Sequence, residues 1–173
     1  TSMATPHVAG VAALVLSKFS TLKVSELKDR IVKTSMPLTS LKMKTASGGM
    51  VSAYNALTNA MPPPDPEDPA NWPVQEHKLS SVHPYPSKSL LVYKVTIPGA
   101  KKISVNFAKF ETEAGYDFVS FSDANGADYG KWSGVHDGEF SPTIVGDTLV
   151  LTLTSDDGVD LHGFDIDKVA VQQ

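Results

Sequence analysis

The stretch 61-MPPPDPEDPANWP-73 divides the sequence into two parts of different character. Six of its thirteen residues are proline and three are acidic. Because proline fixes φ and has no backbone N–H, such a stretch cannot form a helix interior or a central strand. It predicts a semi-rigid, extended linker. The expected parts are therefore residues 1–60, the linker at 61–73, and residues 74–173.

The residues before this linker carry helical patterns. Residues 6–19 are apolar on nearly every side, which predicts a helix that is buried on most faces. Two further helical segments follow, at 24–35 and 48–60. A segment this short buries too little surface to enclose its first helix. We therefore expect residues 1–60 to be one part of a larger domain whose remainder lies upstream.

Beyond the linker the hydrophobic period changes to two. Alternating, β-branched or aromatic residues fill five segments, at 89–97, 101–110, 117–123, 147–155 and 164–171. Turn signals rich in Gly and Asp separate these segments. Short strands at this spacing, with no helical pattern between them, predict an antiparallel β-sandwich of about 100 residues. The expected fold class is therefore a helical segment followed by an all-β domain.

Composition and charge exclude several classes of function. The net charge is −4 and the pI is about 5.7, whereas a nucleic-acid-binding protein normally carries a clustered basic surface. The longest apolar run, 8-VAGVAALVL-16, is far shorter than the roughly 20 residues of a membrane span. The sequence contains no cysteine, which rules out disulfides, thiolate zinc sites and a cysteine nucleophile. We expect neither a nucleic-acid partner nor a membrane partner.

The stretch 1-TSMATPHVAG-10 places Ser2 just before the first expected helix. A serine in that position is most often an N-cap, which accepts a hydrogen bond from a free backbone N–H. The position also suits a nucleophile, because a helix N-terminus offers free N–H groups and a positive dipole end to an oxyanion. Position alone favours the cap.

The ten residues from Thr1 to Gly10 resemble the nucleophile segment of the subtilisin-like serine proteases, the peptidase S8 family. The stretch 48-GGMVSAYNAL-57 resembles that family's closing segment. The resemblance implies that residues 1–60 are the helical C-terminal portion of an α/β peptidase domain. It also implies that Ser2 is the catalytic nucleophile, with its backbone N–H in the oxyanion hole. The implied activity is that of a serine endopeptidase, which cleaves peptide or protein substrates through an acyl-enzyme.

The family's catalytic residues follow the chain order aspartate, histidine, serine, so the resemblance places the first two before Thr1. His7 is five residues from Ser2, which on a helix is about 140° of rotation and about 7.5 Å of rise. The two side chains therefore diverge, and we expect His7 to be a packed, hydrogen-bonded core residue. Because a lone serine hydroxyl is a weak nucleophile, we expect this chain alone to be inactive and its partner to be the missing N-terminal portion of the protease. The alternative nucleophile is Thr1, acting through its own α-amine.

Two acidic clusters lie in the expected β-domain. The first contains Glu111, Glu113 and Asp117, and the second surrounds Asp156. Scattered carboxylates most often form a solvated acidic edge. Carboxylates brought together from two loops instead suit a hard cation, which takes six to eight oxygen ligands, and calcium is the expected ion outside the cell.

Residues 75–173 resemble CUB domains in four short motifs. These are Pro-Tyr-Pro at 84–86, Tyr-Asp at 116–117, Ser-Gly at 133–134, and Ser-Asp at 155–156 followed by Gly-Phe at 163–164. The resemblance implies that Glu111 or Glu113 holds Ca²⁺ together with Asp117 and Asp156. The usual disulfides of CUB domains are missing, which favours a bacterial-type relative, and another β-sandwich of the kind that follows proteases is the alternative.

The leading hypothesis from the sequence is the C-terminal part of a secreted, subtilisin-like serine endopeptidase with an appended CUB-like β-sandwich. The competing hypothesis is a non-catalytic, calcium-stabilised module that serves binding or targeting. Substrate specificity is not encoded in these residues, because the strands that form the substrate pocket would lie upstream.

Overall fold

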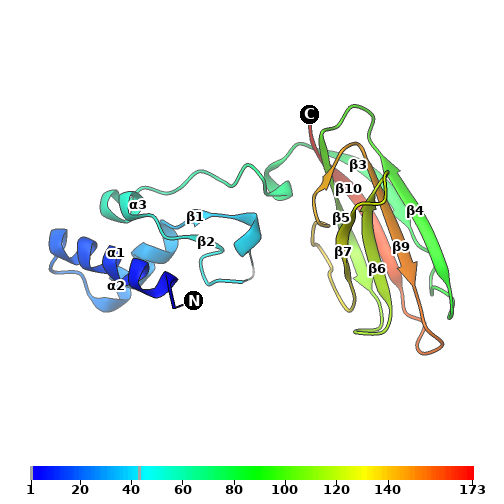
Figure 1. The fold of residues 1–173 in the computed structure, drawn as a ribbon, viewed down its shortest axis with the longest axis horizontal. Coiled ribbons are helices and arrows are strands. Elements are labelled where there is room, and N and C mark those ends of the chain that lie inside the picture. The colour runs from blue at the N-terminus through cyan, green and yellow to red at the C-terminus, as the bar shows by residue number, and fades with distance from the viewer. Residues whose placement is uncertain (1, 43) are drawn as a thin grey trace. The chain divides into compact units, whose positions relative to one another are not determined.

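A computed structural model describes residues 2–42 and 44–173 (Figure 1). The chain forms two compact units, one ending at Asn71 and the other beginning at Trp72. The first unit is mainly helical and the second consists of antiparallel strands, as the change of hydrophobic period predicts. None of the helices in the described residues is long and apolar enough to cross a membrane.

Three helices and a two-stranded sheet make up the first unit. In chain order its elements are α1 (Ala4–Lys18), α2 (Val24–Lys33), β1 (Met36–Pro37), η1 (Thr39–Leu41), β2 (Gly49–Met50) and α3 (Ala53–Thr58). The backbone N–H of Lys23 donates to the Glu26 carboxylate at 2.7 Å, which satisfies one free donor at the start of α2. Val11, Val15 and Ala56 form the buried centre of this unit, where α1 packs against α2 and α3.

Within this chain α1 is buried on one face only, as expected if residues 1–60 are too few to enclose it. Only Val11 and Val15 of this helix are buried, while Val8, Leu14 and Leu16 are 41%, 50% and 37% exposed. The physical reason is the small number of neighbours: α2 and α3 are short and contact α1 along one face. An apolar helix therefore presents its remaining faces to solvent.

The proline-rich stretch is less uniform than the sequence suggests. Residues 61–65 have no regular secondary structure, but Pro69–Asn71 form a short 3₁₀ helix, η2. The buried carboxylate of Asp65 accepts hydrogen bonds from the Thr39 N–H at 2.5 Å, the Thr39 hydroxyl at 2.7 Å and the Glu67 N–H at 3.0 Å. Burial alone raises the pKa of Asp65, yet these hydrogen bonds hold it below its ordinary value. Two aspartates that accept nearby N–H groups thus fold part of the expected linker into turns.

The second unit is a sandwich of two antiparallel four-stranded sheets, as expected. One sheet has the strand order β3 (Val74–Ser80), β10 (Gly163–Gln172), β5 (Lys102–Glu111) and β8 (Ile144–Val145). The other has the order β4 (Leu90–Thr96), β9 (Thr148–Thr154), β6 (Phe118–Asp123) and β7 (Asp128–Trp132). Figure 1 shows the two sheets facing each other.

The core of the sandwich is aromatic and aliphatic. Alternate residues of β9, namely Leu149, Leu151 and Leu153, are fully buried, as a strand with one face on the core requires. The ring of Phe107 lies close to the rings of Phe110, Phe121, Phe164 and Trp132. This packing fixes the strand ends from which the loops discussed below emerge.

Candidate functional site

Three loops meet at one end of the sandwich because of the strand register. Glu111 at the end of β5 pairs with Gly163 at the start of β10, and Asp165 of β10 pairs with Ser80 at the end of β3. In the other sheet, Thr154 at the end of β9 pairs with the first residues of β4 and β6. The β3–β4, β5–β6 and β9–β10 loops therefore lie at the same end.

Asp117 is the centre of an acidic cluster in these loops. Its side chain is buried, with 1% of the residue exposed. Oδ2 accepts a hydrogen bond from the Tyr85 hydroxyl at 2.5 Å, and Oδ1 accepts one from the Asp156 N–H at 2.9 Å. The Thr112 hydroxyl donates to the Asp117 carbonyl at 3.1 Å. One carboxylate thus connects all three loops.

Glu113 and Asp156 complete the cluster. One carboxylate oxygen from each of Glu113, Asp117 and Asp156 lies within 4.8 Å of the other two. Glu113 Oε2 accepts the Val159 N–H at 3.2 Å, and Asp156 Oδ1 accepts the Gly158 N–H at 2.6 Å. A Cβ at Gly158 would lie 2.8 Å from both of these oxygens, so a larger residue there would require the two carboxylates to shift.

The structure distinguishes between the two glutamates that the sequence left open. Glu111 is the last residue of β5, and its carboxylate lies 3.3 Å from Lys109 Nζ. It takes no part in the cluster formed by Glu113, Asp117 and Asp156. Among the candidate metal ligands, the geometry therefore brings three together and leaves Glu111 apart.

Tyr85 is a site residue that the sequence analysis did not assign. It is fully buried, and its hydroxyl donates to Asp117 and accepts the Glu113 N–H at 3.2 Å. Burial, together with the adjacent Asp117 carboxylate, raises the pKa of Tyr85 well above its ordinary range. The hydroxyl is therefore a permanent donor at neutral pH. The signal that could have revealed it was its place in the Pro-Tyr-Pro motif.

The donor set of this cluster fits a calcium ion. All three side chains offer carboxylate oxygens, the ligands that Ca²⁺ prefers. Three carboxylates this close repel one another, so a bound cation would relieve the repulsion. The backbone N–H groups of Asp156, Gly158 and Val159 already orient the three carboxylates.

Ser2 lies at the start of the first unit and is exposed. The N-cap of α1 is Met3, in helical conformation, and no side chain caps this helix end. Within the described residues, the Ser2 hydroxyl has no hydrogen-bond partner. The interpretation of Ser2 as an N-cap is therefore not supported.

His7 is not the core residue that the sequence predicts. It is exposed, and its Nδ1 lies 2.8 Å from the Met3 carbonyl oxygen one turn earlier in the chain. It is exposed because α2 and α3 cover a different face of α1. Its hydrogen bond is with the helix backbone rather than with Ser2. The alternative nucleophile Thr1 lies outside the described residues.

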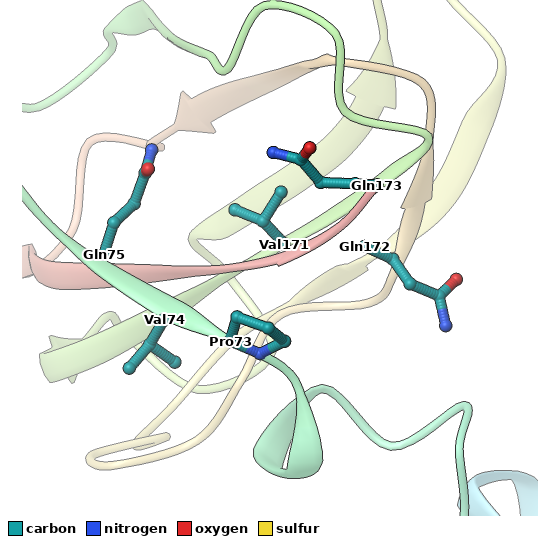
Figure 2. A pocket seen from close by; sticks show the side chains of 6 residues that line it. All are labelled: Pro73, Val74, Gln75, Val171, Gln172 and Gln173. Carbon is teal, nitrogen blue, oxygen red and sulfur yellow. The ribbon is translucent and has the colours of Figure 1, made fainter.

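A separate hollow of about 310 Å³ lies between the start of β3 and the end of β10 (Figure 2). Its lining residues are Pro73, Val74, Gln75, Val171, Gln172 and Gln173. Ala170 pairs with Val74 here, whereas Asp165 pairs with Ser80 near the acidic cluster, so the two features lie at opposite ends of β10. The six lining residues include no titratable side chain and none of the expected site residues.

Comparisons with known families match the two units separately. The model of the Subtilase family matches residues 1–66, and the model of the CUB domain matches residues 75–167. Subtilisin DY of Bacillus licheniformis is 55% identical over 38 residues, which are 22% of this chain and 14% of that protein. The extracellular basic protease of Dichelobacter nodosus is 38% identical over 81 residues, covering 43% of this chain and 13% of that protein.

The chain spans only 10–14% of the length of each of three curated relatives, which are these two proteases and the subtilisin-like protease 1 of Plasmodium berghei. Among solved structures, the MASP-1 CUB2 domain bound to Ca²⁺ matches with a TM-score of 0.39 and 16% identity. That match covers 53% of this chain and 88% of the other.

Proposed function

The chain belongs to the CUB domain family through residues 75–167, and its residues 1–66 match the model of the Subtilase family. From this premise we propose that the chain is the nucleophile-bearing C-terminal part of a subtilisin-like serine endopeptidase with a calcium-stabilised CUB module. The observation that carries the proposal is Ser2, which is exposed, lies two residues before α1 and falls within the segment that matches the subtilases. The substrates are peptides or proteins.

In the proposed reaction, Ser2 Oγ attacks the carbonyl carbon of the scissile peptide bond. The Oγ proton passes to a histidine that this chain does not supply, and the oxyanion is held in part by the Ser2 backbone N–H. The histidine then protonates the leaving amine, and the C–N bond breaks to leave an acyl-enzyme ester on Ser2. Water hydrolyses the ester and restores the Ser2 hydroxyl.

The proposed partner of the chain is the N-terminal portion of the protease, with the catalytic aspartate and histidine. Support comes from His7, whose ring nitrogen is bonded to the Met3 carbonyl and not to Ser2. The net charge of −4 gives no reason to add a nucleic-acid partner, and we propose no membrane partner. We further propose an extracellular location, by analogy with the relative that is named an extracellular protease.

The 173-residue chain alone should not hydrolyse peptides. A serine hydroxyl without an adjacent base is a poor nucleophile, so a fluorogenic peptide assay should give the same rate as buffer, and an active-site serine probe should not label the chain. Adding the N-terminal portion of the protease should restore labelling. Turnover by the chain alone, lost in Ser2→Ala, would contradict the proposed need for a partner.

We propose that Glu113, Asp117 and Asp156 hold a Ca²⁺ ion in the β-sandwich. Support comes from the 4.8 Å grouping of their oxygens and from the backbone donors that orient them. When bound, the ion would supply positive charge that offsets the repulsion among the carboxylates. Its role in this chain would be structural, because it would hold together loops that contribute no nucleophile.

Glu113→Gln should weaken calcium binding by at least about tenfold, because it removes one of three ligand charges. Glu111→Gln should leave the affinity unchanged, because Glu111 pairs with Lys109 outside the cluster. Isothermal titration of CaCl₂ into the two variants and the wild type measures both. Equal losses in the two variants would contradict the assignment of Glu113.

A second candidate function is a non-catalytic, calcium-stabilised module for binding or targeting. It is favoured by one observation: the acidic cluster is complete within the second unit, whereas the one histidine of the first unit, His7, lies 2.8 Å from the Met3 carbonyl oxygen and not against Ser2. The serine probe separates the two functions. Labelling of Ser2 in the presence of the N-terminal portion supports the peptidase, and its absence there supports the module.

A further inference from the structure

A second group of metal-ligating side chains lies beside the acidic cluster and belongs to neither proposed role. His83 is in the β3–β4 loop, His162 is the last residue before β10, and Asp165 is the third residue of β10. One potential ligand atom from each lies within 4.8 Å of the other two. The three side chains are about one-third exposed, so an ion could reach them from solvent.

The Asp165 carboxylate is shared between the two imidazoles. His83 Nε2 lies 3.0 Å from Oδ1, and His162 Nε2 lies 2.7 Å from Oδ2. Ser80 donates its hydroxyl to Oδ1 at 2.5 Å. Asp165 therefore lies between the two imidazoles, with a different carboxylate oxygen next to each ring.

The hydrogen bond at the other nitrogen of His83 determines what Nε2 can do. His83 Nδ1 lies 2.6 Å from the His162 carbonyl oxygen, which can only accept, so Nδ1 carries the proton. In a neutral His83 the lone pair of Nε2 then faces the Asp165 carboxylate at 3.0 Å. Two acceptors at this distance repel unless a proton or a metal cation lies between them. An N–H to a backbone carbonyl is also the arrangement that orients a metal-binding histidine.

We propose that His83 Nε2, His162 Nε2 and an oxygen of Asp165 bind a zinc ion, independently of the function proposed above. Two imidazoles and one carboxylate, with a position left for water, form a donor set that suits Zn²⁺ and suits Ca²⁺ poorly. Ligand atoms on a tetrahedral zinc lie about 3.3 Å apart when the bonds are about 2.0 Å long. The 3.0 and 2.7 Å separations join the two imidazoles to different oxygens of Asp165, so the ligands must move apart and the carboxylate must turn to place one oxygen on a shared ion.

The imidazole rings must turn to share one ion, because the nitrogen lone pairs of stacked rings lie in nearly parallel planes. They are stacked, with centroids 3.9 Å apart and an angle of 17° between the ring planes. Their partial exposure allows this rotation. The bound ion would hold the β3–β4 loop against β10. That loop also carries Tyr85, whose N–H donates to the Leu161 carbonyl at 3.2 Å and whose hydroxyl donates to Asp117.

Zinc titration of the 173-residue chain tests the proposal, with saturating CaCl₂ present so that the acidic cluster does not compete. Isothermal titration should show one zinc ion bound per chain. His162→Ala should weaken zinc binding by more than about tenfold, and Ser80→Ala, which keeps all three ligands, by about tenfold. His77→Ala is the matched control on β3 and should bind zinc as the wild type does.

NMR of the histidine side chains provides a test that needs no variant. Zinc should shift the ring-nitrogen resonances of His83 and His162 in the wild type and leave those of His77 unchanged. The proposal is overturned if the wild type binds no zinc, if zinc shifts only other histidines, or if His77→Ala weakens binding as much as His162→Ala. If His162→Ala fails to fold, the wild-type NMR result decides.

Discussion

Ser2→Ala in the complete protease should lower kcat on a peptide substrate by about a million-fold, the loss expected when the nucleophile of a serine triad is removed. KM should change little, because the hydroxyl acts in the transition state and not in substrate binding. Steady-state kinetics on a fluorogenic peptide, with active-site titration of the wild type, measures this effect.

A matched serine variant controls for nonspecific damage. Ser25 is exposed on α2, and Ser25→Ala should retain wild-type kcat. The alternative nucleophile makes the opposite prediction: Thr1→Ala would abolish activity, and Ser2→Ala would retain it. A Ser2→Ala protein with more than a small fraction of wild-type kcat would rule out Ser2 as the nucleophile.

Asp117→Ala should strongly destabilise the β-sandwich, in two separable steps. In chelator, the Tyr85 hydroxyl and the Asp156 N–H lose their buried acceptor, at a cost of about 1–3 kcal/mol for each unsatisfied group. In calcium, the variant also loses the stabilisation by the bound ion, which is about 2.7 kcal/mol when free calcium is 100 times Kd. Urea unfolding of wild type and variant, each with calcium and with chelator, separates the two contributions.

Asp157→Ala is the control for this experiment. Asp157 is an exposed neighbour of the cluster that pairs with Lys88 at 2.9 Å, and exposed pairs contribute little to stability. Its unfolding midpoint should match that of the wild type in both conditions. Identical unfolding curves for the wild type with and without calcium would contradict the calcium site, even if Asp117→Ala is destabilised.

The sequence predicts the two-part organisation because its signals are local. Period-two alternation, as in Leu149, Leu151 and Leu153, follows from the geometry of one strand and needs no knowledge of its neighbours. The exposure of α1 depends instead on which elements surround it. Its apolar sequence predicts burial, but α2 and α3 contact only one face.

The candidate sites depend on strand register, which the sequence does not reveal. Glu111 is the last residue of β5, whereas Glu113 lies two residues later, in the following loop, and reaches the cluster. The sequence alone does not show where the strand ends. His83 and Asp165 are 82 positions apart and meet because β10 pairs with β3. No motif spacing could have brought these two residues together.

The contacts of Asp117 have a consequence for the thermodynamics of the unfolded chain. Asp117 and Asp156 are 39 positions apart, so a cation held by both would close a long loop of polypeptide. A cross-link of this kind lowers the conformational entropy of the unfolded state, as a disulfide does in the chain-entropy account. Unlike a disulfide, it would be insensitive to reductants and would respond to the concentration of the free ion. In a chain without cysteine, stability would then be set by the ionic composition of the surroundings.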